Sequence, residues 1–173
     1  VTMDRQKNLN AFNTYMIEEL GEAYLKIEAD DDIYASVITG AGRSFVSGAD
    51  IAEMERMSAT EAKRFSYNAN SVFLRLENTA KPVIAAINGF AIGGGCELAM
   101  CCDIRLASDR AVFAQTEVNL GITPGFGGTQ RLPRIIGNAR AAEMIFTGKF
   151  IDAYTARDWW LVSEVYPHDE LLP

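Results

Sequence analysis

The sequence is poor in positive charge, has a single histidine and contains no long apolar segment. Lys and Arg number 16 against 23 Asp and Glu, which gives a net charge of −7 and argues against nucleic acid as the main partner. No run of about 18 uninterrupted apolar residues occurs, so we expect no membrane-spanning helix. The first residues, VTMDRQKN, lack the pattern of a secretory signal peptide.

Cysteine is scarce as well. Cys96, Cys101 and Cys102 are odd in number, and two of them are adjacent in an apolar run. This pattern favours buried, reduced thiols in the cytoplasm over a disulfide framework or a metal site. The only histidine, His168, lies in a polar stretch near the end of the chain, so neither a Cys–His nor a Ser–His catalytic pair is expected.

The 173 residues are 49% hydrophobic, which is enough for one domain with a sizeable core over 1–173. Strand and helix patterns alternate, which predicts an α/β fold with largely parallel pairing. Strands are expected over 1–4, 33–39, 82–87, 104–107, 112–114 and 162–166. Helices are expected over 14–29, 59–76, 128–136, 139–146 and 152–159, with Asn13 as an N-cap and Ser58 with Glu61 as a capping box. We expect Trp159 and Trp160 to pack in the core.

The stretch NGFAIGGGCELAMCCD, residues 88–103, is the feature around which we interpret the chain. It follows an apolar strand and combines a glycine-rich turn with the start of a buried helix. Glycines let backbone N–H groups approach a ligand, and a helix N-terminus adds unpaired donors and partial positive charge. Burying an unpaired carboxylate there costs on the order of several kcal/mol, so the presence of Glu97 in this helix requires an explanation.

A second loop, Ser47-Gly48-Ala49-Asp50, follows another predicted strand and leads into a short helix. If the two strands are neighbours, both loops open at the carboxyl edge of the sheet, where α/β folds bind ligands. Backbone N–H groups from the two loops then converge on one oxygen. Such an oxyanion hole is worth about 3–4 kcal/mol per donor in acyl chemistry.

Four segments closely resemble the enoyl-CoA hydratase/isomerase family, the crotonase superfamily. They are NGFAIGGGCELAMCCD, SFVSGADI, FAQTEVNLGITPGFGGTQRLPRIIG and ARDWWLVSEVYP, and they occur in matching order along the full length given. The resemblance implies a crotonase-type spiral of repeated β-β-α units that binds acyl-CoA thioesters. Family members continue with further helices past the strand at 162–166, so we expect this chain to lack the C-terminal helical part and to begin inside its first strand. We expect a homotrimer or hexamer for the full-length protein.

The resemblance also implies roles for individual residues. The two backbone N–H groups that hold the thioester oxygen in family members correspond to those of Ala49 and Gly94. The paired glutamates of hydratase members correspond to Glu97 and Glu117. In this assignment Glu97 orients and activates a water molecule, Glu117 protonates Cα, and the two amides stabilise the enolate oxygen. The thioester accepts the electrons, so no metal and no cofactor beyond the CoA of the substrate are expected.

Further contacts with the CoA thioester are implied around the same loops. Ser47, Asp50 and Ile51 flank the Ala49 donor, and Lys7 follows the first strand, where family members contact the nucleotide part of CoA. A solvated lysine is the simpler interpretation of Lys7.

Simpler interpretations of the other features stay open from the sequence. Glu97 can be a core carboxylate paired with Arg105 or another arginine, and Glu117 can be a surface loop residue or a helix cap. The glycine run can be only a tight connection. GFGGTQR suggests a phosphate loop, but no GxxxxGK[ST] pattern is present, and we interpret it as shaping the pocket beside Glu117.

The leading functional prediction is hydration of a short-chain trans-2-enoyl-CoA to a 3-hydroxyacyl-CoA and the reverse dehydration. Crotonyl-CoA is the first substrate to test. An isomerase that moves a double bond between C3 and C2 can work with one carboxylate, so the presence of both Glu97 and Glu117 favours a hydratase. A non-catalytic or RNA-binding relative is the third possibility, and the acidic charge argues against it.

Overall fold

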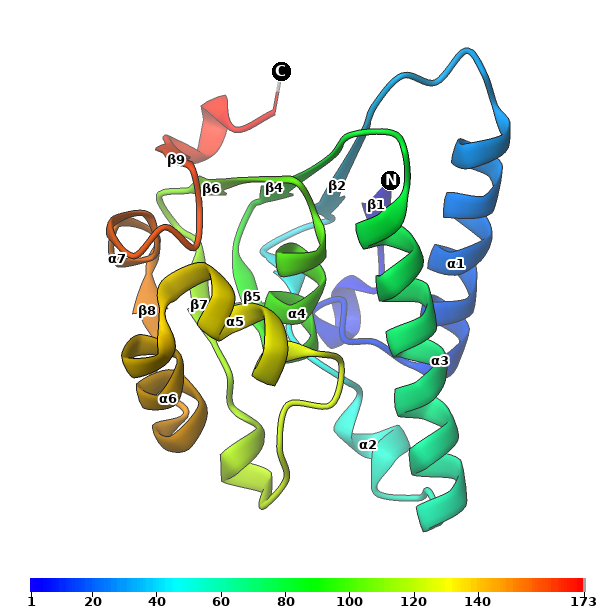
Figure 1. The fold of residues 1–173 in the computed structure, drawn as a ribbon, viewed down its shortest axis with the longest axis vertical. Helices are drawn as coiled ribbons and strands as arrows, with labels where there is room; N and C mark the ends of the chain where they lie inside the picture. Colours follow the sequence, from blue (N-terminus) through cyan, green and yellow to red (C-terminus); the bar gives the residue numbers. More distant parts are fainter. Residues whose placement is uncertain (173) are drawn as a thin grey trace.

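The computed structural model describes residues 1–172 as two sheets with helices packed around them (Figure 1). A five-stranded sheet has the order β1-β2-β4-β6-β9 and is parallel throughout. Its strands are β1 (Thr2–Met3), β2 (Ser36–Gly40), β4 (Val83–Ile87), β6 (Ile104–Ser108) and β9 (Glu164–Tyr166). A four-stranded sheet has the order β3-β5-β7-β8, with β3 (Ser44–Val46), β5 (Phe90–Ile92), β7 (Val112–Ala114) and β8 (Ile151–Asp152). Only its β7–β8 pair is antiparallel.

From β2 to β7, successive strands belong alternately to the five-stranded and the four-stranded sheet. Each of the pairs β2/β3, β4/β5 and β6/β7 places its first strand in the five-stranded sheet and its second strand in the four-stranded sheet, and helices follow. These helices are α2 (Ile51–Met54) and α3 (Ala59–Asn78) after β3, α4 (Gly94–Cys101) after β5, and η2 (Glu117–Leu120), α5 (Gly128–Ile136) and α6 (Asn138–Thr147) after β7. The predicted spiral of β-β-α units is therefore confirmed.

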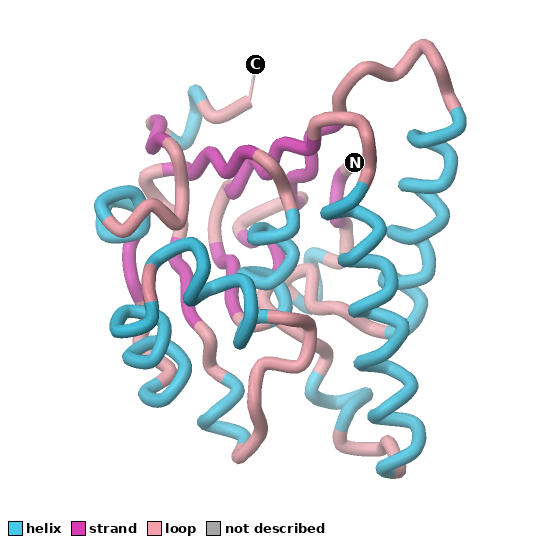
Figure 2. Tube along the Cα trace, viewed as in Figure 1, coloured by secondary structure: helices cyan, strands magenta, loops and turns pink. Residues whose placement is uncertain are grey.

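Two long helices cover one flank of the molecule, side by side in Figure 1 and cyan in Figure 2. They are α1 (Thr14–Ala29) and α3. The Asn13 side chain accepts a hydrogen bond from the Met16 amide at 2.9 Å, and Ser58 with Glu61 forms a capping box at the start of α3. Both predicted helix starts are confirmed, because the cap side chains satisfy amides that the helix leaves without partners.

Helix α4 lies in the interior, between α3 and α5 in Figure 1, and all of its residues are buried. It approaches β3 closely at Gly95, where a Cβ atom would lie 1.9 Å from the Val46 carbonyl oxygen. Only glycine permits this approach, and it brings the N-terminus of α4 to the end of β3.

The remaining elements include several that the sequence patterns did not predict. The short helices η1 (Gln6–Asn8) and η3 (His168–Glu170) were not predicted, whereas α7 (Ala153–Asp158) confirms the helix expected over 152–159. Strand β3 lies between the predicted strand at 33–39 and the predicted loop at 47–50, β5 lies in the predicted glycine-rich turn, and β8 was not predicted. The strand expected from residue 33 begins only at Ser36. The predicted core position of Trp160 is wrong, because its side chain is 77% exposed, whereas Trp159 packs partly buried against the core.

The three thiols are free and buried, as the sequence predicted. Within residues 1–172, no helix is both long and apolar enough to cross a membrane. No cluster of three or more His, Cys, Asp or Glu side chains that fits a metal ion is found in the same residues.

Replacement of Gly95 by alanine tests the close contact between α4 and β3. Helix propensity alone favours alanine by up to about 1 kcal/mol, whereas the clash with the Val46 carbonyl should lower the free energy of unfolding by at least about 3 kcal/mol. Urea denaturation measures the difference. Gly125→Ala is the control, because its Cβ would meet nothing nearer than the Ser66 hydroxyl oxygen at 3.7 Å. A Gly95→Ala protein as stable as the control would contradict the packing described here.

Candidate active site

A cavity of about 260 Å³ opens where β3 and β5 end. Its wall includes Ala49, Gly94, Glu97 and Glu117, which the sequence singled out from three separate loops. The predicted strands at 33–39 and 82–87 are parallel neighbours as β2 and β4, but the two loops directly follow β3 and β5, which were not predicted. Strands β3 and β5 are parallel neighbours as well and bring the two loops together at one carboxyl edge.

The backbone of residues 48–50 pairs with Phe12 as a short parallel bridge. The Phe12 amide donates to the Gly48 carbonyl at 2.7 Å, and the Asp50 amide donates to the Phe12 carbonyl at 2.7 Å. In a trans peptide the N–H points away from the C=O of the same unit, so the Ala49 N–H faces away from Phe12. Within residues 1–172 this N–H has no hydrogen-bond acceptor.

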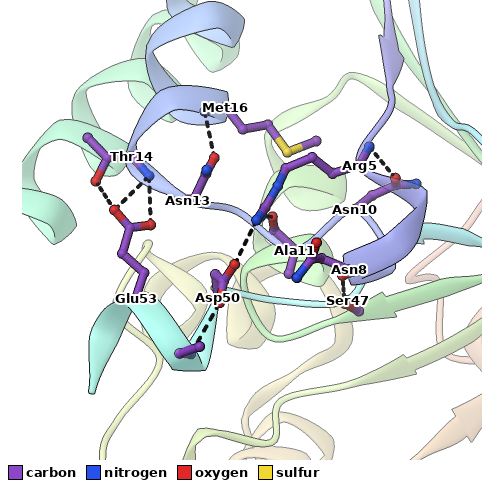
Figure 3. Close-up of polar contacts among 11 residues, drawn as sticks. Arg5, Asn8, Asn10, Ala11, Asn13, Thr14, Met16, Ser47, Asp50 and Glu53 are labelled. Carbon is purple, nitrogen blue, oxygen red and sulfur yellow. Dashed lines mark hydrogen bonds and ion pairs between the residues drawn. The ribbon is translucent and has the colours of Figure 1, made fainter. Parts of the chain in front are cut away.

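An ion pair between Arg5 and Asp50 also holds this segment (Figure 3). The Arg5 guanidinium contacts the Asp50 carboxylate at 2.9 Å and donates to the Ala11 carbonyl at 2.7 Å. Asp50 also accepts from the Ala52 amide as the N-cap of α2, and the hydrogen bond from Arg5 is the main reason that the pKa of Asp50 is lowered. The Asp50 side chain therefore holds the loop and does not line the cavity beside Ala49.

Gly94 is the first residue of α4. The carbonyl of Gly93 accepts from the Glu97 amide at 2.9 Å, so the N–H of the same peptide unit, that of Gly94, points away from the helix. It finds no acceptor within residues 1–172. Gly93 has φ 50° and ψ −118°, and a Cβ at that position would lie 2.8 Å from a Glu117 carboxylate oxygen. Glycine is thus required at 93 both for its conformation and for the space it leaves to Glu117.

Glu97 is 1% exposed, and its carboxylate accepts two backbone hydrogen bonds. Its Oε1 atom accepts from the amides of Phe126 at 2.8 Å and Gly128 at 2.7 Å. Burial, and then the nearby Glu117 carboxylate, raise the pKa of Glu97 to about 7, against the effect of the two amides. The ion pair with Arg105 that we considered is not present, because the Arg105 guanidinium donates to the carbonyls of Leu161 and Cys102.

Glu117 begins η2 and also lines the cavity. Its Oε2 atom is buried without a hydrogen-bond partner within residues 1–172, and burial raises the pKa of its carboxyl group. Gln115 is completely buried, and neither atom of its side-chain amide has a partner in that part of the chain. The simple surface-loop interpretation of Glu117 does not hold, because its carboxylate faces the cavity wall at Gly93.

The other predicted contact residues separate into two groups. Ser47 and Ile51 line the cavity, whereas Lys7 is exposed in η1 and does not line it. His168 pairs through Nδ1 with the Ser108 hydroxyl at 3.0 Å, a contact that the sequence did not predict. Ser108 is completely buried at the end of β6, which leaves its hydroxyl a structural partner of His168 and not an accessible nucleophile.

Some residues that build the site were not predicted from the sequence. The amides of Phe126 and Gly128 hold Glu97, and Arg131 donates to the Phe126 carbonyl at 2.9 Å while it pairs with Glu77 at 2.7 Å. The repeated glycines of GFGGTQR were the available signal, and the structure confirms that this segment shapes the pocket.

Replacement of Glu97 by glutamine tests the raised pKa as a stability effect. The folded pKa of about 7 exceeds the unfolded value near 4.5, so the stability that the neutral carboxyl provides is full below pH 4.5 and is lost as the pH rises through 7. Glutamine cannot ionise, so the variant should be more stable than the original protein at pH 8 by about 1–3 kcal/mol, with the difference shrinking toward pH 5. Urea denaturation at several pH values measures this.

The matched control is Glu22→Gln, since Glu22 is exposed on α1. Its stability should follow that of the original protein across the pH range. Equal stability of the Glu97→Gln and original proteins at pH 8 would contradict a strongly raised pKa.

Comparison with known proteins agrees with this geometry. The profile of the enoyl-CoA hydratase/isomerase family matches residues 1–173. The chain is 52% identical to the short-chain-enoyl-CoA hydratase of Clostridium acetobutylicum and 49% identical to the crotonyl-CoA hydratase of Syntrophomonas wolfei, in each case over 99% of its own length and 66% of the relative's length. The crystal structure of an enoyl-CoA hydratase from Bacillus anthracis superimposes with a TM-score of 0.95 at 38% identity, covering 98% of this chain and 66% of that one.

The chain thus spans about 66% of the length of these relatives. Its alternating β-β-α spiral, its four matching segments and the family profile agree with one another over the whole length given. This chain belongs to the enoyl-CoA hydratase/isomerase family.

Proposed function

We propose that the protein containing this chain hydrates trans-2-enoyl-CoA thioesters to 3-hydroxyacyl-CoA and catalyses the reverse dehydration. The observation that carries the proposal is the single cavity in which two glutamates meet two backbone amides that have no acceptor within residues 1–172. The names of the two similar curated proteins, a short-chain-enoyl-CoA hydratase and a crotonyl-CoA hydratase, support the same reaction.

In the proposed reaction the thioester oxygen lies between the amides of Ala49 and Gly94. Addition of the water oxygen to Cβ moves electrons onto the thioester oxygen and forms an enolate. Donors that are already oriented stabilise this charge more in the transition state than in the bound substrate, and this difference accelerates the reaction. The Gly48 and Gly93 carbonyls are hydrogen-bonded on the far side of the two peptide units, which keeps both N–H groups in place.

In this proposal the two glutamates transfer the protons. Glu97 accepts a proton from water as the hydroxyl group forms its bond to Cβ, and Glu117 gives a proton to Cα as the enolate collapses. Because the carboxylates are buried near each other, both pKa values are raised, so the pair holds a proton at higher pH than two exposed carboxyl groups do. The Oε1 atom of Glu97 is occupied by two amides, which leaves its second oxygen for the water.

The remaining features of the substrate site are proposals of the same kind. In this proposal Ser47 and Ile51, which line the cavity, contact the acyl-CoA beside Ala49, and Lys7, which is exposed outside the cavity, contacts the nucleotide part of CoA. The CoA belongs to the substrate and no further cofactor is invoked. A homotrimer or hexamer and a cytoplasmic location remain predictions, the latter supported by three free thiols.

An enoyl-CoA isomerase is the alternative within the family. It moves a proton between two carbons and needs one carboxylate, whereas this cavity contains two. Conversion of a trans-3-enoyl-CoA without any hydration of crotonyl-CoA would favour the isomerase.

Glu97→Gln and Glu117→Gln test the acid–base pair. Each substitution should lower the turnover of crotonyl-CoA by about 10²–10⁴-fold, because each removes one proton-transfer group, while acyl-CoA binding is retained. Loss of the enoyl-thioester absorbance measures turnover, and calorimetry with a saturated acyl-CoA measures binding.

Glu22→Gln again serves as the control and should retain full activity. Turnover near that of the original protein in either cavity variant would defeat the assignment of the pair.

Gly94→Pro tests the backbone donor at the start of α4. Proline is tolerated at the first position of a helix but has no N–H. Gly94→Ala is the matched control, because it keeps the N–H and adds the same Cβ atom 3.0 Å from the Phe126 ring. We expect the proline variant to turn over crotonyl-CoA about 10²–10³-fold more slowly than the alanine variant. Equal rates, with circular dichroism showing both proteins folded, would exclude Gly94 as a donor.

A further inference from the structure

The peptide unit between Gly125 and Phe126 is held from both sides. Its N–H, that of Phe126, donates to Oε1 of Glu97 at 2.8 Å. Its carbonyl, that of Gly125, accepts from the Ser66 hydroxyl at 2.8 Å and from the Asn70 side-chain amide at 2.7 Å. Ser66 and Asn70 lie one turn apart on α3. Helix α3 therefore holds the carbonyl side of this peptide unit, while the N–H side donates to Glu97.

We propose that Asn70 and Ser66 are positioning residues for Glu97, which they orient through the Gly125–Phe126 peptide unit. Their importance for turnover rests on the proposed function, whereas their effect on the Glu97 carboxyl group does not. Neither side chain reaches the reacting atoms in this scheme, because each acts on a carbonyl that faces away from Glu97.

The physical basis is the rigidity and polarity of the peptide unit. Because the unit is planar and trans, fixing the direction of its C=O also fixes the direction of its N–H. Hydrogen bonds to the carbonyl further polarise the unit and strengthen the bond that its N–H donates. Gly125 and its neighbour Gly127, which has φ 99°, make this loop easy to rotate when the grip is removed.

The second amide bound to Glu97 is secured differently. The peptide unit between Gly127 and Gly128 has its carbonyl bonded to the amides of Gln130 and Arg131, at 3.0 Å each, in the first turn of α5. Helix formation by α5 alone therefore orients the Gly128 donor. The Phe126 donor has no such helix behind it, so its orientation depends on α3, with Arg131 holding the next carbonyl along the loop.

Substitution of Asn70 or Ser66 leaves the charges around Glu97 unchanged. The titratable groups that influence Glu97 or are influenced by it are Glu117 from η2, Arg131 from α5 with its partner Glu77 from α3, and the Cys96 and Cys101 thiols of α4 itself. Neither Asn70 nor Ser66 ionises. A change in the titration of Glu97 in their variants therefore reports the hydrogen bond from Phe126 and not a lost charge.

The chain offers a matched control on the same helix. Asn70 donates both to the Gly125 carbonyl and to the Ser66 carbonyl one turn back. Asn78 makes the corresponding bond one turn back, to the Leu74 carbonyl at 2.6 Å, and has no bond to the loop. Asn78→Ala thus removes the local helix contact alone, and Ser66→Thr keeps the hydroxyl that Ser66→Ala removes.

The experiment is a direct titration of the Glu97 carboxyl group in the complete protein without substrate. Glutamate labelled with ¹³C at the carboxyl carbon is followed by isotope-edited infrared spectroscopy in a Glu117→Gln background, and the Glu97 signal is assigned by its loss in Glu97→Gln. A weaker hydrogen bond to the charged form raises the pKa. We expect Asn70→Ala to raise the titration midpoint by roughly 0.5–1 pH unit and Ser66→Ala by less. Asn78→Ala and Ser66→Thr should leave the midpoint unchanged.

A second measurement uses the same substitutions with Glu117 intact. The acid limb of kcat/KM for crotonyl-CoA hydration should move to higher pH in Asn70→Ala, with KM little changed, because the base rather than the substrate contacts is perturbed. A purely structural role would lower thermal stability without moving either the titration or this limb.

The outcomes separate the two proposals. A midpoint that stays fixed in both Asn70→Ala and Ser66→Ala, or that moves equally in Asn78→Ala, overturns the positioning role even if the protein is an active hydratase. A midpoint that moves as expected in a protein that does not hydrate crotonyl-CoA supports the positioning role and refutes the proposed function. If Asn70→Ala fails to fold, the comparison of Ser66→Ala with Ser66→Thr decides.

Discussion

The site depends on one buried carboxylate and on the two hydrogen bonds that it accepts from backbone amides. Glu97 is enclosed in a helix whose residues are all buried, and its Oε1 atom bonds to the amides of Phe126 and Gly128. A carboxylate buried without such donors would simply stay protonated, since the desolvation cost of the charge is several kcal/mol or more. The two amides bring its pKa back to about 7, where the group can both accept and release a proton. The glycine loop 125–128 and the start of α5 supply the two donor amides, and hydrogen bonds from α3 hold the loop in place.

The same arrangement occurs at four peptide units around the cavity, where the carbonyl accepts hydrogen bonds on one side and the N–H of the same unit points to the other side. The carbonyl of Gly48 is bonded by Phe12, that of Gly93 by the first turn of α4, that of Gly125 by α3, and that of Gly127 by the first turn of α5. Backbone amides oriented in this way need no side chain in the cavity and lose little freedom on binding. The spiral topology makes this possible, because successive β-β-α turns deliver one loop after another to the same edge of the four-stranded sheet.

Local patterns predicted the elements whose signals are local. The caps at Asn13 and Ser58, the apolar faces of α1 and α3, and the buried helix around Glu97 follow from residue spacing, and the resemblance to the family supplied the spiral. The strands β3 and β5 were missed because each has only three residues beside glycine or serine and is defined by its pairing with other strands, β3 with β5 and β5 also with β7. Trp160 was misplaced because it has φ 68° just past the end of α7, which turns its side chain outward. The contacts of Asn70 and Ser66 with Gly125 join residues 55 and 59 positions apart, a separation at which no local pattern applies.

The cavity is also where the chain departs from the ordinary rules of a protein core. Within residues 1–172, the buried side-chain polar atoms that lack a partner are both amide atoms of Gln115 and one oxygen of Glu117. Gln115 and Glu97 lie together against Gly128, and Glu117 lies against Gly93, so these atoms gather at one place. Each such atom costs about 1–3 kcal/mol, and the raised pKa of Glu97 adds a further cost above neutral pH. This concentration of destabilising features in one place supports the proposal that the cavity serves chemistry rather than folding, since such features are expected at functional sites.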